Sequence, residues 1–336
     1  PSRLFEIFKH RETFAITVRR HSERYNSRRT ELWTKQLASA CSELLGCDPS
    51  ELDPGYPVHI VSSNTHSVEN CLNSWYTENL DRIIRWAKDR QHPFLERSWN
   101  EPFDLGYALA REFFQANVDA AHESHHAESA QGIYRLRETA STGIQVQLID
   151  TERVCRTAVD PALSGLEAHE RGLIVNIDYA FGEQAEHILR NLLMLFGSNV
   201  RSVSLLGKAG GLVGRRGDLL VPTAFVEQSG DRYYTMPGTF VENMEETVRR
   251  LEERLPGGSV YSGPMLTVDG TLLQNRDMLR YYRHIWRCIG MEMEGAYYFR
   301  QFQEGESIGL IPRDVTVGLY YYVSDAPLKP RESLAA

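Results

Sequence analysis

The sequence predicts an α/β fold with a mixed, mostly parallel central sheet flanked by helices, preceded by an α-rich α+β N-terminal domain. In the second half of the chain, short apolar runs that suit buried strands alternate with longer helical patterns. In the first half, helical spacing of apolar residues predominates and strand-like runs are few. The 336 residues are enough for two domains of ordinary size. We therefore expect an N-terminal domain over residues 1–165 and a second domain over residues 166–336.

The composition is that of an ordinary globular protein, with 42% hydrophobic and 24% charged residues. The formal net charge of −8 gives no basic footprint for nucleic acid. No apolar window approaches the roughly 18 residues of a membrane span. The five cysteines form no Cys-x-x-Cys pair, which indicates reduced thiols. We expect a cytoplasmic protein with no nucleic-acid partner and no membrane partner.

Helices and two short strands are predicted in the N-terminal half. Apolar residues three to four positions apart predict helices, and short β-rich runs predict strands. The predicted helices cover residues 3–45, 75–87 and 103–118, and the predicted strands cover residues 58–61 and 144–150.

Two polar features of this half allow two interpretations each. Arg19, Arg20, Arg28 and Arg29 form either a phosphate-facing cluster or the solvated face of a helix. Residues 62–67, with the sequence Ser-Ser-Asn-Thr-His-Ser, make a longer polar run than a helix cap requires. This run is therefore a candidate for contact with a ligand or with the second domain.

A metal site is not expected. His122 and His126 lie four residues apart and would share one face of a helix. No third ligand stands at the spacing of a known metal motif, so a polar helix end is favoured. No cofactor is expected either.

The second half alternates strands and helices. Residues 172–177 are apolar on both faces, as a parallel strand is, and are predicted to be the first central strand. The chain then turns into a helix that begins at Glu183. Further strands are predicted over residues 219–226 and near 260–261, and further helices over residues 239–255 and from residue 277.

A glycine-rich turn is predicted after the second strand of this half. It contains Gly207, Lys208, Gly210 and Gly211, and the next strand begins at residues 217–218. Glycines let the backbone approach a ligand closely and can direct N–H groups at an anion. Such a turn alone is weak evidence for a site.

Two strand ends in this half carry acidic residues. Glu292 and Glu294 stand where an apolar strand passes into a helix, and Asp325 follows Ser324 at the end of a β-rich run that Pro327 stops. Ligands of open α/β sheets bind at such strand ends, and a carboxylate can accept hydrogen bonds from both hydroxyls of a ribose. The alternative interpretations are that the two glutamates only favour the start of a helix and that Ser324 and Asp325 only form a turn. The combination with the glycine-rich segment favours a site.

In this order the motifs resemble the nucleoside phosphorylase and nucleosidase superfamily, whose members cleave the N-glycosidic bond of nucleosides and nucleotides. The resemblance covers about residues 170–330 and rests on the Gly-x-x-Gly-Gly segment, Met-Glu-Gly-Ala at 293–296 and Ser-Asp at 324–325. Within the superfamily, the phrase Val-Ser-Asp-Ala-Pro-Leu-Lys at 323–329 is most similar to AMP nucleosidases. The resemblance implies a nucleoside phosphorylase-like fold, a purine nucleotide or nucleoside as the small-molecule partner, and a homo-oligomer.

The resemblance also implies roles for individual residues. Asp325, beside Ser324, would protonate N7 of the leaving purine. Glu294 would hold the ribose hydroxyls, and its charge would favour the cation that develops on the sugar. Met293 would pack on the sugar, and Glu292 would support or replace Glu294.

The same comparison favours water over phosphate as the nucleophile. Hexameric bacterial phosphorylases carry an arginine and a serine around the glycine-rich segment, where this sequence has Leu205 and Lys208. In related hydrolases a glutamate near the first loop activates water, and Glu183 and Glu186 are the candidates here. Glu183 also has the ordinary explanation that acidic residues favour a helix N-terminus.

Three cations are candidates for a substrate phosphate. Lys208 either pairs with the 5′-phosphate of a nucleotide or points to solvent. Arg215 and Arg216 either help bind phosphate or lie on the surface before a strand.

These expectations converge on the hydrolysis of AMP to adenine and ribose 5-phosphate. One alternative is a purine nucleoside phosphorylase, or a nucleosidase acting on another nucleoside or nucleotide such as ATP. Another is a nucleotide-sensing module without turnover, against which the presence of both Glu294 and Asp325 argues. The N-terminal domain is expected to act as a lid or a regulator.

Overall fold

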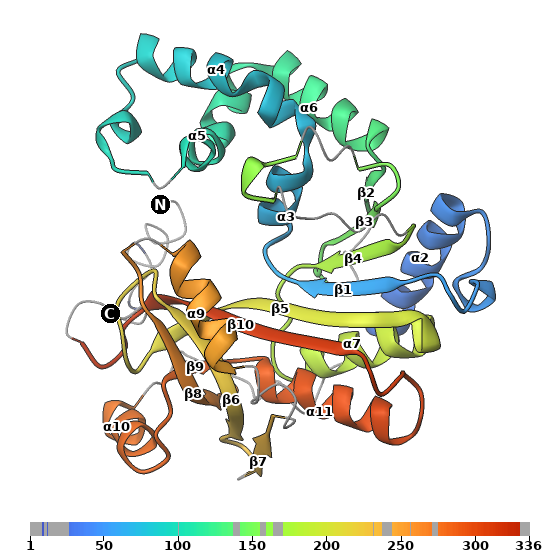
Figure 1. The fold of residues 1–336 in the computed structure, drawn as a ribbon, viewed down its shortest axis with the longest axis vertical. Helices are drawn as coiled ribbons and strands as arrows, with labels where there is room; N and C mark the ends of the chain where they lie inside the picture. The colour runs from blue at the N-terminus through green and yellow to red at the C-terminus, as the bar shows by residue number, and fades with distance from the viewer. Residues whose placement is uncertain are drawn as a thin grey trace.

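The structure is a computed structural model. It describes residues 9, 12, 27–99, 101–136, 142–154, 159–163, 171–230, 232–236, 244–255, 257–270 and 275–329. Within these ranges ten strands form a single sheet (Figure 1). The strands are β1 (Val58–Ser62), β2 (Ile133–Arg135), β3 (Val146–Asp150), β4 (Leu173–Ile177), β5 (Val200–Gly211), β6 (Leu219–Glu227), β7 (Arg232–Thr235), β8 (Val260–Thr267), β9 (Gly290–Glu292) and β10 (Thr316–Asp325).

The sheet is mixed, and parallel pairing forms its centre. Strand order is β10-β6-β8-β9-β5-β1-β4-β3-β2, with β7 beside β6 and an additional pairing of β10 with β5. β5 pairs in parallel with both β1 and β10, β1 with β4, and β8 with both β6 and β9. The antiparallel pairs are β2–β3, β3–β4, β6–β7, β5–β9 and β6–β10. The predicted mixed α/β architecture is confirmed.

Residues 173–177 form a strand, β4, as predicted, but this strand is not the first central strand of the sheet. β1, from the N-terminal half, lies between β4 and β5 at the middle of the sheet and pairs in parallel with both. β2 and β3 extend the same sheet beyond β4. The sheet therefore crosses the predicted domain boundary near residue 165. The buried apolar positions of β1, Val58 and Ile60, match a central strand, but a five-residue run carries no signal of its neighbours.

Helices cover the sheet and extend beyond it. In Figure 1, α7 and α11 lie side by side below the sheet, and α2 packs against α7. The main core joins strand residues such as Ile60, Val175 and Leu205 to Leu189 of α7 and Phe299 of α11. The helices are α2 (Ser27–Leu45), α3 (Thr65–Leu72), α4 (Ser74–Asp89), α5 (Pro102–Ala116), α6 (Val118–Ala130), α7 (Glu183–Phe196), α9 (Met244–Arg254), α10 (Arg276–His284) and α11 (Gly295–Ser307).

Helices α4, α5 and α6 form a separate group at the top of Figure 1 with a small core of its own. Trp75 and Tyr76 of α4 pack there around Phe113 of α5. Asn73 begins α4, since its side chain accepts a hydrogen bond from the Trp75 N–H at 2.9 Å. This α-rich group fits the predicted character of the N-terminal half.

Other expectations for the N-terminal half are settled in part. Arg28 and Arg29 lie exposed on α2, whereas Arg19 and Arg20 lie outside the described residues.

In the described ranges, no helix is both long and apolar enough to cross a bilayer. Four cysteines, at positions 41, 47, 71 and 288, are free thiols.

Candidate active site

The three sequence motifs meet at the C-terminal part of β5. On one side β10 runs parallel to it, so that Tyr321 pairs with Gly207 and Asp325 with Gly210. On the other side β9 runs antiparallel, and Met291 pairs with Gly210. Glu292, which ends β9, Glu294, which follows it, and Asp325, which ends β10, therefore flank the same short segment of β5.

The prediction of a glycine-rich turn is wrong, because β5 continues as a strand through Gly211. The backbone groups of Gly207, Gly210 and Gly211 lie in pairings with β9 and β10, so they do not form an anion-binding nest. Glycine is required at these positions because neighbouring atoms leave too little room for a side chain. A Cβ on Gly207 would lie 2.5 Å from the ring of Tyr321, and one on Gly211 would lie 2.7 Å from a backbone oxygen.

Glu294 lies at the centre of this arrangement. One of its carboxylate oxygens lies 2.8 Å from the point where a Cβ would stand if Gly207 carried a side chain. The other oxygen accepts a hydrogen bond from the Met293 N–H at 3.1 Å. The residue is only 2% exposed. Burial, reinforced by the nearby carboxylate of Glu292, raises the pKa of Glu294 well above its usual value. Glu294 is therefore a buried carboxyl group whose ionisation the surrounding protein disfavours.

Glu292 has a structural role. Its carboxylate accepts hydrogen bonds from the hydroxyls of Thr267 and Tyr321 and from the N–H groups of Glu294 and Gly295. The last two donors are N–H groups at the start of α11, which have no partner within the helix and which a carboxylate stabilises. Burial raises the pKa of Glu292, although these donors oppose the shift. Glu292 thus fixes the backbone that presents Glu294.

Asp325 ends β10 and is 4% exposed. Its Oδ1 accepts a hydrogen bond from the Ser324 hydroxyl at 3.1 Å, and the same hydroxyl lies 3.2 Å from the carbonyl oxygen of Ala209 on β5. Pro327 follows and packs within 3.3 Å of the position of a Cβ on Gly210. Ser324 and Pro327 therefore hold Asp325 beside β5.

The start of α7 is tied to the same place. The N–H of Gly182, which precedes Glu183, donates to the carbonyl oxygen of Met293 at 2.8 Å. Glu183 stands in the first turn of α7 and is half-buried. Glu186 instead forms ion pairs with Arg300 and, at 3.0 Å, with Arg190. Of the two candidate bases, only Glu183 directly follows Gly182, which is hydrogen-bonded to Met293, the residue before Glu294.

The polar run at the end of β1 contacts the C-terminal half, as the sequence suggested. The Ser62 hydroxyl lies 3.2 Å from that of Tyr298 on α11. Ser63 donates to the side-chain oxygen of Asn176 on β4 at 3.2 Å. Asn64 caps α3 by accepting from the His66 N–H at 3.0 Å. The C-terminal ends of β1 and β4 thus lie at one edge of the sheet, next to β5.

A lysine and a tyrosine lie over this edge. The Lys208 ammonium is 5.4 Å from the ring centroid of Tyr179, and the Tyr179 hydroxyl donates to the carbonyl oxygen of Leu206 at 3.1 Å. The pKa of Tyr179 is raised, mainly by burial of its side chain and to a smaller extent by the negative charge of Glu294. Lys208 is exposed. Lys208 and Tyr179 therefore lie together beside Leu206 of β5.

Arg215 takes part in the loop between β5 and β6. Its guanidinium donates to the carbonyl oxygen of Gly257 and lies 3.7 Å from Asp218. The Arg215 N–H also donates to Asp218 at 2.8 Å. These contacts give Arg215 a role in shaping the loop, and its place at a substrate phosphate stays a prediction.

A family model with the description "Family of unknown function (DUF6909)" matches residues 1–336. The chain belongs to the DUF6909 family. No curated protein matches it.

Solved structures similar to this DUF6909 protein include three bacterial nucleosidases. A 5′-methylthioadenosine/S-adenosylhomocysteine nucleosidase of Helicobacter pylori has 11% identity and a TM-score of 0.44, over 80% of this chain and 85% of the other. A futalosine hydrolase of Helicobacter pylori has 10% identity and a TM-score of 0.44, over 80% and 87%. The Campylobacter jejuni methylthioadenosine nucleosidase has 10% identity and a TM-score of 0.46, over 83% and 90%.

Sequence reasoning missed the tyrosines that surround the acids. Tyr298 and Tyr321 are buried, and the charge of Glu294 contributes to the raised pKa of both. Tyrosines with buried rings usually find a polar partner for the hydroxyl. Two runs of adjacent tyrosines beside the acids, at 297–298 and 320–322, were the available signal in the DUF6909 sequence.

We expect Gly295→Ala to destabilise the DUF6909 protein by about 1–3 kcal/mol, because overpacking a dense core has this cost. The added Cβ would lie 2.2 Å from the ring of Phe225 and 2.5 Å from the Tyr321 hydroxyl. Urea unfolding measures the change. Gly270→Ala is the control, since a Cβ there meets nothing within 4 Å, and equal midpoints for the two variants would contradict the packing described here.

Proposed function

We propose that this protein hydrolyses the N-glycosidic bond of a purine nucleotide, with AMP giving adenine and ribose 5-phosphate. The strongest support is that two buried carboxyl groups lie beside one segment of β5. The Glu294 carboxylate lies against Gly207, and Asp325 pairs with Gly210. The sequence resemblance to nucleosidases assigns these two residues complementary tasks on one substrate.

Glu294 is the group that binds the ribose. A carboxyl group whose pKa is raised by burial can exchange hydrogen bonds with two sugar hydroxyls in either protonation state. As the C1′–N9 bond breaks, positive charge develops on the sugar, and this charge favours the ionised form of Glu294. The resulting attraction acts in a site from which water is largely excluded, where electrostatic stabilisation is strongest.

Asp325 is the general acid. The bonding electrons of C1′–N9 move to the purine, and a proton from Asp325 at N7 makes the base a better leaving group. Ser324, which donates to Asp325, and Pro327, which packs behind Gly210, keep the carboxyl group beside β5. The protonated base leaves as neutral adenine.

Water is the nucleophile in this proposal, and Glu183 is its activator. Water forms the new bond from its oxygen to C1′ and passes a proton to the carboxylate of Glu183. Support comes from the hydrogen bond between Gly182 and Met293, which joins the start of α7 to the residue before Glu294. Glu186 is less suited because Arg190 and Arg300 already neutralise it.

Lys208 is the proposed partner of the 5′-phosphate. We expect Lys208→Met to raise KM for AMP about tenfold, which corresponds to a loss of about 1.4 kcal/mol of binding free energy, and to leave cleavage of adenosine within about twofold. Steady-state kinetics with both substrates measure the effect. Lys35→Met is the control, because Lys35 is an exposed lysine on α2 paired with Glu31. An equal loss for both substrates would contradict the assignment.

The proposal is tested by chromatographic detection of adenine after incubation of AMP with the full chain in phosphate-free buffer. Release of adenine supports hydrolysis. Release that requires added phosphate would indicate phosphorolysis instead, with ribose 1,5-bisphosphate as the sugar product.

A nucleotide sensor without turnover is the second candidate. It is favoured by the nearly complete burial of Glu294 and Asp325, which leaves both carboxyl groups without open access to solvent. Tight binding of AMP, without release of adenine, would distinguish it from the enzyme.

The remaining expectations are part of the same proposal. A homo-oligomer is implied by the sequence resemblance, and Phe181 and Leu206, which are 47% and 42% exposed, offer apolar surface near Tyr179 for a second copy. Sedimentation analysis of wild type and Phe181→Ser tests this. A cytoplasmic location and a regulatory N-terminal half are further proposals.

A further inference from the structure

Helices α4, α5 and α6, which we call the α4–α6 group (residues 74–130), contact the rest of the protein mainly through polar side chains. Among the residues that the structure describes, no hydrophobic core cluster contains members both from this group and from the sheet. Two short segments connect the group to the rest of the chain, at Asn73 before α4 and at Gln131–Gly132 after α6. Polar interfaces between parts of one chain usually permit relative motion.

Two buried carboxyl groups and one guanidinium lie close to these connections. Glu69 of α3 is 5% exposed, and Glu128 of α6 is 2% exposed. The same nitrogen of Arg135, on β2, forms an ion pair with Glu69 and another, at 2.9 Å, with Glu128. The two carboxyl groups are also hydrogen-bonded to each other. Because one positive charge serves two adjoining acids, one of the acids is expected to keep a proton.

The buried side chains around the two acids are neutral. Asn73 donates from its amide to Glu128 at 3.2 Å, and Gln147 of β3 donates to Glu69 at 2.7 Å. Asn73 also donates to the Ser124 hydroxyl of α6 at 3.0 Å. These hydrogen bonds hold the acids in place but supply no second positive charge. Ionisation of both acids is therefore not compensated.

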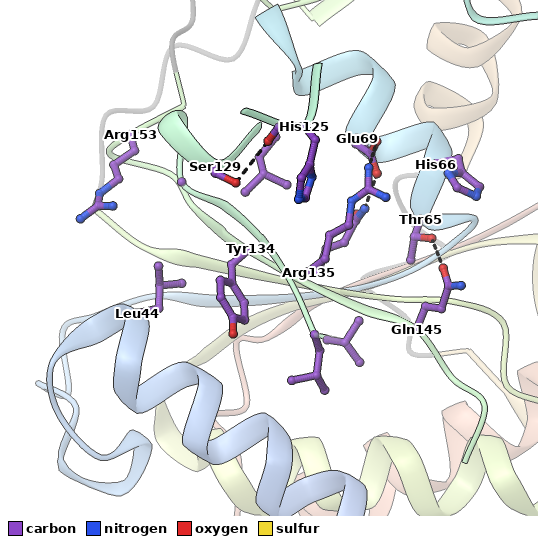
Figure 2. Close-up of a pocket in the computed structure, with 15 residues that line it drawn as sticks. Leu44, Thr65, His66, Glu69, His125, Ser129, Tyr134, Arg135, Gln145 and Arg153 are labelled. Carbon is purple, nitrogen blue, oxygen red and sulfur yellow. Dashed lines mark hydrogen bonds and ion pairs between the residues drawn. The ribbon is translucent and has the colours of Figure 1, made fainter. Parts of the chain in front are cut away.

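A cavity of about 480 Å³ gives water access to this cluster (Figure 2). It is lined by Glu69 and Arg135 and by His66 and His125, and both histidines are exposed. In Figure 2 the guanidinium of Arg135 points toward Glu69. The cavity is large enough for several water molecules of about 30 Å³ each. A proton that leaves Glu69 therefore has a short route to solvent.

We propose that Glu69, Glu128 and Arg135 form a proton-dependent latch, which holds the α4–α6 group against the sheet and releases it as pH rises. Glu69 stands on the sheet side, because Leu72 of the same helix packs on Ile133 and Ile149. With one proton the latch is neutral, and the two acids share a hydrogen bond. Without it two carboxylates face each other, and the repulsion is relieved when Glu128 moves away with α6.

The pKa of Glu69 sets the pH range of the latch. Burial raises this pKa to about 8, the hydrogen bond to Glu128 and the charge of Glu128 contribute, and Arg135 opposes the shift. In the open form Glu69 meets water and its pKa returns to about 4.5. Between these values the closed form binds one proton more than the open form. The stabilisation of the closed form is therefore full below about pH 4.5, falls as pH rises, and is lost above about pH 8.

The other charged groups near the latch do not reverse this direction. The ionisable side chains around the latch and its cavity are His66 on α3, His125 on α6, Tyr76 on α4 and Arg153, which pairs with Asp150 at 3.4 Å. Burial raises the pKa of Tyr76, so this residue stays neutral. His125 lies 3.3 Å from Glu128. Its protonation below pH ~6.5 attracts Glu128 and also favours the closed form at low pH.

A chain of buried hydrogen bonds extends from the latch to the end of β1. Asn176 of β4 donates to Gln147 at 3.0 Å, and Ser63 donates to Asn176 at 3.2 Å. Ser63 directly follows β1. The latch is therefore connected to the polar run that contacts α11.

Hydrogen–deuterium exchange of the full chain, followed by mass spectrometry between about pH 5.5 and 7.5, tests the latch. After correction for the intrinsic exchange rate, we expect peptides from α6 and β2 to exchange about tenfold faster for each pH unit, since one proton is released on opening. Peptides from α7, which belongs to the main core, should not change. No substrate is added, so failure of the proposed hydrolase activity leaves this test intact.

Three variants assign the effect to the latch. Glu69→Gln mimics the protonated acid, so its exchange should not depend on pH in this range. Glu128→Gln lets Arg135 pair with Glu69 alone, so the pH dependence should move to lower pH, and it serves if Glu69→Gln fails to fold. Glu123→Gln is the matched control. Glu123 also lies on α6 and pairs with an arginine, at 2.6 Å, but it is 48% exposed, so this variant should behave as wild type.

Three results would overturn the proposal. One is corrected exchange of α6 and β2 that does not change with pH. Another is a pH dependence that persists unchanged in Glu69→Gln and Glu128→Gln. The last is an equal acceleration of α7, because the whole fold rather than the latch would then be opening.

Discussion

Replacing Asp325 with asparagine is expected to lower kcat for adenine release from AMP by about 10²–10⁴-fold, the usual contribution of a general acid. Asparagine keeps the shape and the hydrogen bond from Ser324 but has no proton to give to N7. KM should change little, since the loss concerns the transition state. Kinetics at saturating AMP measure the effect.

The control for this substitution is Asp314→Asn. Asp314 is an exposed acid just before β10 begins at Thr316, so its loss should leave kcat unchanged. If Asp325→Asn retained the wild-type kcat, protonation of the base by Asp325 would be ruled out, even if the protein proved to be a hydrolase.

Glu294→Gln is expected to lower kcat/KM for AMP by about 10²–10³-fold, a loss typical for removal of one electrostatic contact to a transition state. Glutamine can still hydrogen-bond the sugar but cannot acquire the negative charge that stabilises the developing cation. The loss should be greatest at high pH, where Glu294 of the wild type, with its raised pKa, is ionised in the largest fraction of molecules. A pH series of kcat/KM measures it.

The matched control is Glu304→Gln, which changes an exposed acid on the same helix, α11. Circular dichroism and urea midpoints of both variants separate a folding defect from a catalytic one. Equal kcat/KM values for Glu294→Gln and wild type at every pH would remove Glu294 from the reaction.

The acids could be located from sequence because they stand at the ends of strands with strong local patterns. The apolar run before Glu292 and the tyrosine-rich run before Asp325 predict strands regardless of their partners, and strand ends are where ligands bind in such sheets. The mixed α/β architecture followed from the same alternation. What remained hidden was the order of strands, since β1 has only five residues and nothing local places it between β4 and β5.

Misread glycines show another limit of the sequence. Gly207, Gly210 and Gly211 suggest a turn because glycine is common in turns, but the structure keeps them in β5. Glycine is needed at these positions because side chains of the neighbouring strands, such as those of Tyr321 and Met291, occupy the space that a Cβ would take. That information depends on register across the sheet and is absent from the segment itself.

The cluster around Arg135 was equally out of reach. Glu69, Glu128 and Arg135 come from α3, α6 and β2, and their sequence neighbours show no motif. Only the packing of the helices against β2 reveals that two carboxyl groups share one guanidinium. Clusters joined by tertiary packing of this kind need a structure to be seen.

The most direct test of the central claim is release of free base from AMP, ATP, adenosine, inosine and methylthioadenosine, each with and without inorganic phosphate, by the full chain and by Asp325→Asn. The proposed function predicts phosphate-independent release of adenine from AMP that is lost in the variant. Cleavage that is equally fast in Asp325→Asn, or binding of AMP with no release of base under any condition, would contradict it.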